Sequence, residues 1–240
     1  MIVEICANSF ASAFNAERAG AHRIELCSEL AVGGITPSYG LIKHVKDILS
    51  IPVFVLIRPR GGNFTYSEAE FDIMKQDIIM CKELGCEGIV SGVLNQDYTI
   101  DLKRTEELVA LSKPLPFIFH RAFDWIPNIE VGLNSLINLG VKRVLTSGQE
   151  TLAIVGLKKL EQLKAQAQGK ITILPGGGIS LENVLRFKQA GFKEIHCSLS
   201  RFNSNIVKPK ISMNSLEHYD EDKLATSDFE KIKALIDFIK

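Results

Sequence analysis

The chain alternates short apolar segments with longer segments of helical periodicity, and this alternation repeats eight times. The short segments have the length and composition of strands. The expected strands are residues 2–6, 23–27, 53–57, 88–91, 116–120, 141–145, 171–174 and 194–197. The expected helices are residues 9–19, 39–49, 67–84, 102–111, 129–139, 152–166, 181–190 and 229–239. Strands that alternate with helices in this way are parallel, with the helices as crossover connections.

Eight such units in 240 residues match the number and length expected of an α/β fold of the (β/α)₈ TIM-barrel type. We expect a single domain over residues 1–240, with a long polar loop at residues 198–227 between the last strand and the last helix. A doubly wound open sheet is the rival fold. Polar residues within the first two strands disfavour it, because strands covered by helices on both faces are apolar throughout. No Gly-x-Gly-x-x-Gly dinucleotide motif follows the first strand.

The composition excludes several classes of partner. The chain has 28 basic and 28 acidic residues and therefore no net charge, which argues against a nucleic-acid or membrane-surface partner. It contains no apolar run of about 18 residues, so we expect no membrane span. Five cysteines without the spacing of a disulfide framework are typical of reduced thiols in a cytoplasmic protein.

The first two strands carry polar side chains at every second position. Glu4 and Cys6 share one face of the first strand, and Glu25 and Cys27 share the corresponding face of the second. Neighbouring strands lie about 4.8 Å apart, so groups on them can share a ligand. We therefore expect two carboxylates and two thiols at the mouth of the barrel.

The two thiols are candidate metal ligands. Cys6 and Cys27, with His120 or His196 as a third ligand, could hold a soft metal ion such as Cu(I) or Zn(II). The alternative is that both cysteines are small buried apolar residues, as most free cysteines are. The chain has no Cys-x-x-Cys motif, and both interpretations stay open.

The same end of the barrel carries candidates for acid–base catalysis. These candidate catalytic residues are Glu4, Glu25, His120, Asp124 and His196. Two carboxylates in one cleft can divide the roles of acid and base, and imidazoles at strand ends can transfer protons. Asp124 follows His120 by four residues and could orient its ring. The alternatives are ion pairs of the glutamates with Arg58 or Arg60, and histidines that only pack.

Glycine-rich turns and arginines at other strand ends predict an anion site. The candidates are Arg58, Arg60, Ser147, Gly176, Gly177 and Gly178. Guanidinium groups bind oxyanions through paired hydrogen bonds, and glycines allow close approach to the backbone. Ser180 is a suitable cap for a helix beginning at residue 181, and the region after the seventh strand is a usual phosphate position in TIM barrels. The alternative is a tight turn without a ligand.

Seven short stretches at successive strand ends carry a family likeness. They are VEICA (3–7), AHRIELC (21–27), GGITPS (33–38), IRPRGG (57–62), FHRAFD (119–124), RVLTSG (143–148) and PGGGI (175–179). Together they resemble the CutC copper-homeostasis family. The resemblance implies a cytoplasmic (β/α)₈ barrel that handles copper, with Cu(I) as candidate ligand, and a homo-oligomer.

Two hypotheses about function follow from these residues. One is a copper-binding protein with the thiols as ligands. The other is a TIM-barrel enzyme that acts by acid–base chemistry on a small anionic or phosphorylated metabolite. The expected partner is accordingly a copper ion or a small anionic ligand, and whether the protein is an enzyme stays open.

Overall fold

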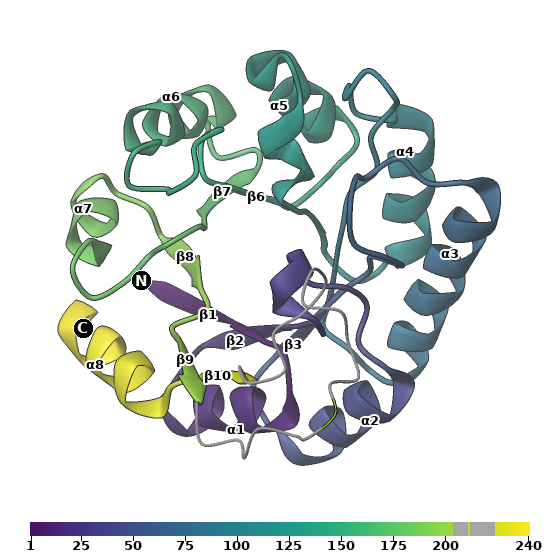
Figure 1. The fold of residues 1–240 in the computed structure, drawn as a ribbon. Helices are drawn as coiled ribbons and strands as arrows, with labels where there is room; N and C mark the ends of the chain where they lie inside the picture. The colour runs from purple at the N-terminus through teal and green to yellow at the C-terminus, as the bar shows by residue number, and fades with distance from the viewer. Residues whose placement is uncertain (204–210, 212–223) are drawn as a thin grey trace.

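The computed structural model describes residues 1–203, 211 and 224–240, and its strands and helices form a barrel (Figure 1). The strands are β1 (Ile2–Ala7), β2 (Arg23–Leu26), β3 (Val53–Leu56), β4 (Gly88–Ser91), β5 (Phe117–Phe119), β6 (Arg143–Thr146), β7 (Thr172–Pro175), β8 (Glu194–Cys197), β9 (Ser200–Asn203) and β10 (Leu224–Ser227). The α-helices are α1 (Phe10–Arg18), α2 (Tyr39–Ile48), α3 (Glu68–Glu83), α4 (Leu102–Ser112), α5 (Ile129–Asn138), α6 (Leu157–Ala167), α7 (Val184–Gln189) and α8 (Phe229–Ile239). Two short 3₁₀ helices are η1 (Leu30–Val32) and η2 (Arg121–Trp125).

The first eight strands form one parallel sheet in the order β7-β6-β5-β4-β3-β2-β1-β8. A parallel bridge between Gly176, just after β7, and His196 on β8 brings the two ends of this sheet together. The helices surround the ring of strands (Figure 1). The predicted TIM-barrel architecture is therefore confirmed.

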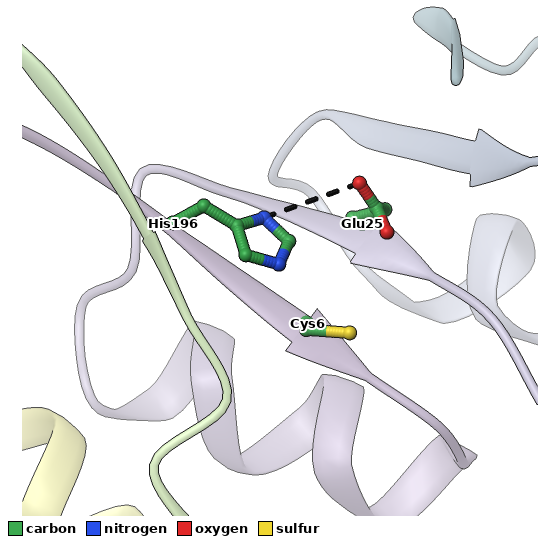
Figure 2. A group of neighbouring side chains, drawn as sticks. All are labelled: Cys6, Glu25 and His196. Atoms are coloured by element: carbon green, nitrogen blue, oxygen red, sulfur yellow. Dashed lines mark ion pairs between the residues drawn. The ribbon is translucent and has the colours of Figure 1, made fainter. Parts of the chain in front are cut away.

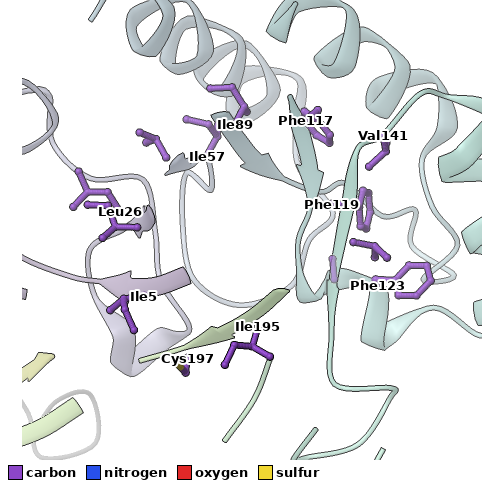
Figure 3. Close-up of a cluster of buried hydrophobic side chains, with 14 of the residues drawn as sticks. Ile5, Leu26, Ile57, Ile89, Phe117, Phe119, Phe123, Val141, Ile195 and Cys197 are labelled. Atoms are coloured by element: carbon purple, nitrogen blue, oxygen red, sulfur yellow. The ribbon is translucent and has the colours of Figure 1, made fainter. Parts of the chain in front are cut away.

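The barrel strands separate two buried layers. Their outward side chains pack against the helices and form the larger apolar core, part of which Figure 3 shows. The inward side chains form a small second cluster, made of Cys6, Cys27, Phe54, Leu56, Val90 and Ile118. Val3 and Ile5 belong to the outer layer, whereas Cys6 belongs to the inner one, as the period-two alternation predicts.

The barrel strands begin and end within two residues of their predicted bounds, but helices α6 and α7 begin well after their predicted first residues. Helix α6 begins at Leu157 and not at residue 152, because the chain before it folds back tightly on the turn after β6: a Cβ atom on Gly156 would overlap the backbone oxygen of Ser147. Helix α7 begins at Val184 and not at residue 181. The prediction of Ser180 as its cap is wrong, because Asn183 occupies the N-cap position and its side chain accepts from the Ser180 N–H.

The expected loop at residues 198–227 contains two strands. β9 and β10 pair as an antiparallel ribbon immediately after β8. Two side-chain hydrogen bonds fix β10 beside the end of β1: Ser227 Oγ donates to the Cys6 carbonyl (3.1 Å), and Asn8 Nδ2 donates to the Ala225 carbonyl (3.0 Å). The rest of the expected loop, 204–210 and 212–223, lies outside the described residues. Within the described chain, every helix is too short or too polar to cross a bilayer.

Candidate functional site

Three polar side chains meet at the C-terminal ends of β1, β2 and β8. In the sheet register Cys6 is the partner of Glu25, and Glu4 is the partner of His196. One ligand atom each from Cys6, Glu25 and His196 lies within 4.8 Å of the other two. Figure 2 shows the imidazole, the carboxylate and the thiol around a common space. Among the described residues, this is the one group of three such side chains close enough to share a metal ion.

A second thiol lies next to this group. The Sγ atoms of Cys6 and Cys27 are 3.7 Å apart, and both residues are buried. The two cysteines singled out from the sequence are thus neighbours on adjacent strands. Of the two candidate histidines, His196 groups with Cys6 and His120 does not. The ligand roles of these residues stay a prediction.

Below the group lies a network of buried ion pairs that the sequence did not lead us to expect. Glu4 accepts hydrogen bonds from Arg23 Nε and from His196 Nδ1 (2.7 Å). Arg23 Nη2 also donates to Glu194 (2.6 Å), which in turn accepts from Arg143 Nε (2.8 Å). A carboxylate on one ring nitrogen fixes the orientation of a histidine and leaves the other nitrogen available for a ligand. Glu4 holds His196 in this way.

Burial and charge shift the pKa values of the group in opposite directions. Burial raises the pKa of Glu4, but the hydrogen bond from His196 and the charge of Arg23 outweigh it and bring the pKa to about 2. Burial raises the pKa of Glu25 to about 7. Burial lowers the pKa of His196, but the charge of Glu25 and hydrogen bonds with Cys6 and Glu4 raise it well above its usual value. Glu4 and His196 therefore form an ionised pair.

The Cys6 thiol is protonated at neutral pH. The hydrogen bond with Cys27 and the burial of the side chain raise the pKa of Cys6 well above its usual value. A metal ion that binds here must displace the thiol proton and, to use His196, the Nε2 proton of its imidazolium, so metal binding releases protons and its affinity depends on pH.

A cavity of about 200 Å³ opens beside the group. Its walls are formed by Cys6, Glu25, Leu30, Gly33, Leu56, Arg58, Phe64, His120, Arg121, Leu145, Gly177, Gly178, His196, Cys197 and Ser198. Cys6, Glu25 and His196 occupy one wall. Hydrogen-bond donors from the loops after β3 and β5 also line the cavity. The barrel mouth therefore offers a small ligand both metal-binding atoms and donor groups.

His120 lines the cavity as a neutral ring. Its Nδ1 accepts a hydrogen bond from the Ala122 N–H (3.2 Å), so its Nε2 carries the proton. Burial, with the charge of Arg58, lowers the pKa of His120 to about 3. The ring also packs on Phe64, with 4.8 Å between ring centroids. His120 is a hydrogen-bond donor at physiological pH.

Asp124 does not orient His120, so this expected contact is wrong. Its carboxylate accepts hydrogen bonds from the Thr146 hydroxyl and the Ser147 N–H, and it pairs with Arg121 (2.9 Å). The 3₁₀ helix η2 brings Asp124 against the turn after β6, where backbone N–H groups satisfy it. Asp124 thus supports the loop after β6.

The alternative of ion pairs between the glutamates and Arg58 or Arg60 is also wrong, because Glu4 pairs with Arg23 and Glu25 with His196. Arg58 lines the cavity, but its Nη atoms donate to the carbonyl groups of residues 32, 34 and 62. Arg60 pairs with Glu70 and does not line the cavity. Both guanidinium groups hold loop backbone, and Arg58 alone of the two can also reach a ligand.

The predicted anion-binding glycines fall into two groups. Gly177 and Gly178 line the cavity with positive φ values of 115° and 72°, a backbone conformation that favours glycine. Gly176 instead bridges to β8, and a Cβ atom there would lie 2.5 Å from the Leu145 side chain. The Ser147 hydroxyl donates to the Glu150 carbonyl (2.5 Å) and accepts from Arg121 (2.8 Å). Anion binding by these residues stays a prediction.

The sequence reasoning missed the charged residues deeper in the barrel. Arg23 and Glu194 precede Glu25 and His196 by two positions, so the same alternation places all four on the inner face. Arg143 lies in β6 and pairs with Glu194. Charged residues at inward strand positions were the signal that could have revealed this network.

Comparisons with known proteins agree on one family. The model of the CutC family matches residues 1–201. The copper homeostasis protein cutC homologs of Mus musculus and Homo sapiens are 44% and 43% identical to this chain; each match covers 98% of the chain and 88% or 87% of the relative. The crystal structure of CutC from Streptococcus agalactiae has a TM-score of 0.79 at 37% identity and covers 82% of this chain and 98% of that one. An aldolase, QR15, has a TM-score of 0.61 at 14% identity over 82% of this chain and 89% of its own, a likeness of fold alone.

Proposed function

This chain belongs to the CutC family of copper homeostasis proteins, and from that premise we propose that it binds Cu(I) directly at the mouth of its barrel. The proposed ligands are the thiolates of Cys6 and Cys27 and the imidazole of His196. We also propose a cytoplasmic location, because five free cysteines suit a reducing compartment. The ion would be the protein's cargo.

The observation that carries the proposal is the 3.7 Å separation of the two sulfur atoms beside an imidazole whose orientation is fixed. Thiolates are soft ligands and select Cu(I) over harder ions. Cys6 and His196 line the cavity, so an ion can reach them from the barrel mouth. Glu25, a harder oxygen ligand, completes a set that Zn(II) could also use, and the experiment therefore compares the two metals.

The direct test is an anaerobic Cu(I) titration of the metal-free protein against a chromophoric Cu(I) chelator of known affinity. We expect one tight site in the wild type. The Cys6→Ser/Cys27→Ser protein should bind at least roughly tenfold more weakly, because it lacks both soft ligands. In a parallel titration, Zn(II) should bind this site with lower affinity than Cu(I).

The chain offers a matched control in a second pair of buried cysteines. Cys81, at the end of α3, and Cys86, in the turn that follows, do not line the cavity. The Cys81→Ser/Cys86→Ser protein loses the same number of thiols and should keep the tight site. Equal loss in both double variants, or none in either, would contradict the proposed ligands.

A further inference from the structure

Unpaired polar atoms concentrate around the barrel-mouth cavity. Among the described residues, six buried side-chain nitrogen or oxygen atoms have no hydrogen-bond partner. Three of them, Glu25 Oε2, Arg58 Nε and His120 Nε2, belong to residues that line this one cavity. Native proteins rarely leave buried polar groups unpaired, because each loses its hydration without compensation. Glu25 Oε2 forms an ion pair with His196 Nδ1 (3.9 Å), so the two atoms left without any partner are the donors Arg58 Nε and His120 Nε2, and they point to a ligand that supplies acceptors.

The His120 ring is fixed with its donor unused. Nδ1 accepts from the Ala122 N–H, which leaves the proton on Nε2. Gly92 makes room for the ring, since a Cβ atom there would lie 2.8 Å from the imidazole. The residue is 5% exposed, and its Nε2 has no acceptor. A buried N–H in a fixed position, on a residue that lines a cavity, is a built hydrogen-bond donor for a ligand.

Two arginines line the cavity with His120. Arg58 is 4% exposed, and its Nε has no partner. Arg121 is held at the rim by Asp124 and by Ser147 Oγ (2.8 Å), while its Nη1 has no acceptor in the described part of the chain. Gly177 lies directly beside this guanidinium: a Cβ atom there would be in ordinary van der Waals contact with Nη1, at 3.5 Å. Both arginines carry permanent positive charge.

We propose that these donors form an oxyanion subsite, which binds a carboxylate or phosphate group of a small metabolite through His120, Arg58 and Arg121. Charged donors form their strongest hydrogen bonds with such groups, and guanidinium geometry matches them. A cavity of about 200 Å³ admits a small molecule. Compared with the sequence expectation, the subsite gains His120 and Arg121 and loses Arg60, Ser147 and Gly176, which do not line the cavity. This proposal does not depend on whether the protein binds copper.

The test uses the metal-free full-length protein and two probes, inorganic phosphate and acetate, with sodium chloride as the control for ionic strength. Long-range ¹H–¹⁵N spectra follow His120 Nε2, identified by its loss in His120→Gln. Trp125 gives a second readout that needs no assignment: it is the single tryptophan, and it packs 4.9 Å from Phe64, which covers His120. We expect a saturable change with at least one probe and none with chloride.

The decisive variant is Arg121→Gln, whose side chain is 43% exposed, so that the fold tolerates the change. It should weaken binding at least roughly tenfold, the effect of losing a charge-assisted hydrogen bond. Arg186→Gln removes the same charge from the exposed face of α7 and should leave binding unchanged. Saturation by phosphate alone or by acetate alone identifies the group that is bound. The proposal is overturned if neither probe saturates, or if both variants weaken binding equally.

Discussion

Replacing Arg23 by Met tests whether the buried ion pairs hold the barrel interior together. The Arg23 side chain is 6% exposed and donates to both Glu4 and Glu194. Methionine keeps much of the volume but removes every donor. Glu4 would then rely on His196, and Glu194 on Arg143. We expect the variant to fold with a clearly lower free energy of unfolding.

Two considerations bear on the size of this effect. Removing one partner of a buried ion pair costs about 3–5 kcal/mol. The pKa of Glu4 falls from 4.5 to about 2, which corresponds to about 3 kcal/mol of stability at neutral pH; Arg23 supplies only part of this, because His196 also holds Glu4, and the rest of the predicted loss comes from Glu194. Because the folded pKa is lower than the unfolded one, this stability is present above pH 4.5 and is lost as the pH falls toward 2. We predict a loss of about 3 kcal/mol at pH 7.

Urea denaturation followed by circular dichroism at pH 7 and pH 3 measures both parts of this prediction. The difference between wild type and Arg23→Met should be smaller at pH 3. Lys43→Met is the control, because Lys43 forms an exposed helical ion pair with Asp47 and should change stability by less than about 0.5 kcal/mol. A loss below about 1 kcal/mol for Arg23→Met, or an equal difference at both pH values, would refute the reasoning.

Two further predictions concern the barrel interior. Gly88→Ala should destabilise the protein by roughly 1–3 kcal/mol, because its Cβ atom would lie 2.7 Å from the Phe54 ring. The control is Gly40→Ala, in helix α2 with open space around it, which should instead stabilise the protein by roughly 0.5–1 kcal/mol. Equal midpoints of urea denaturation for the two variants would contradict the close packing at Gly88. Glu25 should titrate near pH 7 by carboxyl ¹³C NMR, and because its folded pKa is raised, stability should fall as the pH rises from 4.5 to 7. Glu25→Gln should flatten that slope, whereas a ¹³C midpoint near 4.5 would count against the burial of this carboxyl.

The sequence predicted which side chains face the barrel interior, because that property depends only on local backbone geometry. Successive side chains of a strand point to opposite faces, so Glu4 and Cys6 had to share a side once β1 was recognised. The eight repeated units then determined the barrel, and the parallel strands brought the C-terminal ends together. The clustering of Cys6, Glu25 and His196 follows from these two steps.

The ion-pair partners could not be predicted in the same way, because they depend on the register between strands. Glu4 lies opposite Arg23 on β2 and opposite His196 on β8, and that register is set by the stagger of the whole barrel. The alternative pairing of the glutamates with Arg58 or Arg60 used only the rule that these residues lie near the mouth. The partner of Asp124 was equally unpredictable from the sequence, since its carboxylate accepts hydrogen bonds from the turn after β6, a tertiary contact.

Closure of the barrel is what creates the candidate metal site. Glu4 and His196 lie 192 residues apart in the sequence, on the first and the last of the eight barrel strands, and they meet only because β8 pairs with β1. Arg23 donates a hydrogen bond to Glu4, and Glu4 accepts another from His196 Nδ1. The other side of that imidazole lies beside Cys6 (Figure 2). The orientation of a proposed copper ligand is therefore coupled to a buried ion pair on the neighbouring strands. Loss of Arg23 should accordingly disturb the site as well as the stability of the fold.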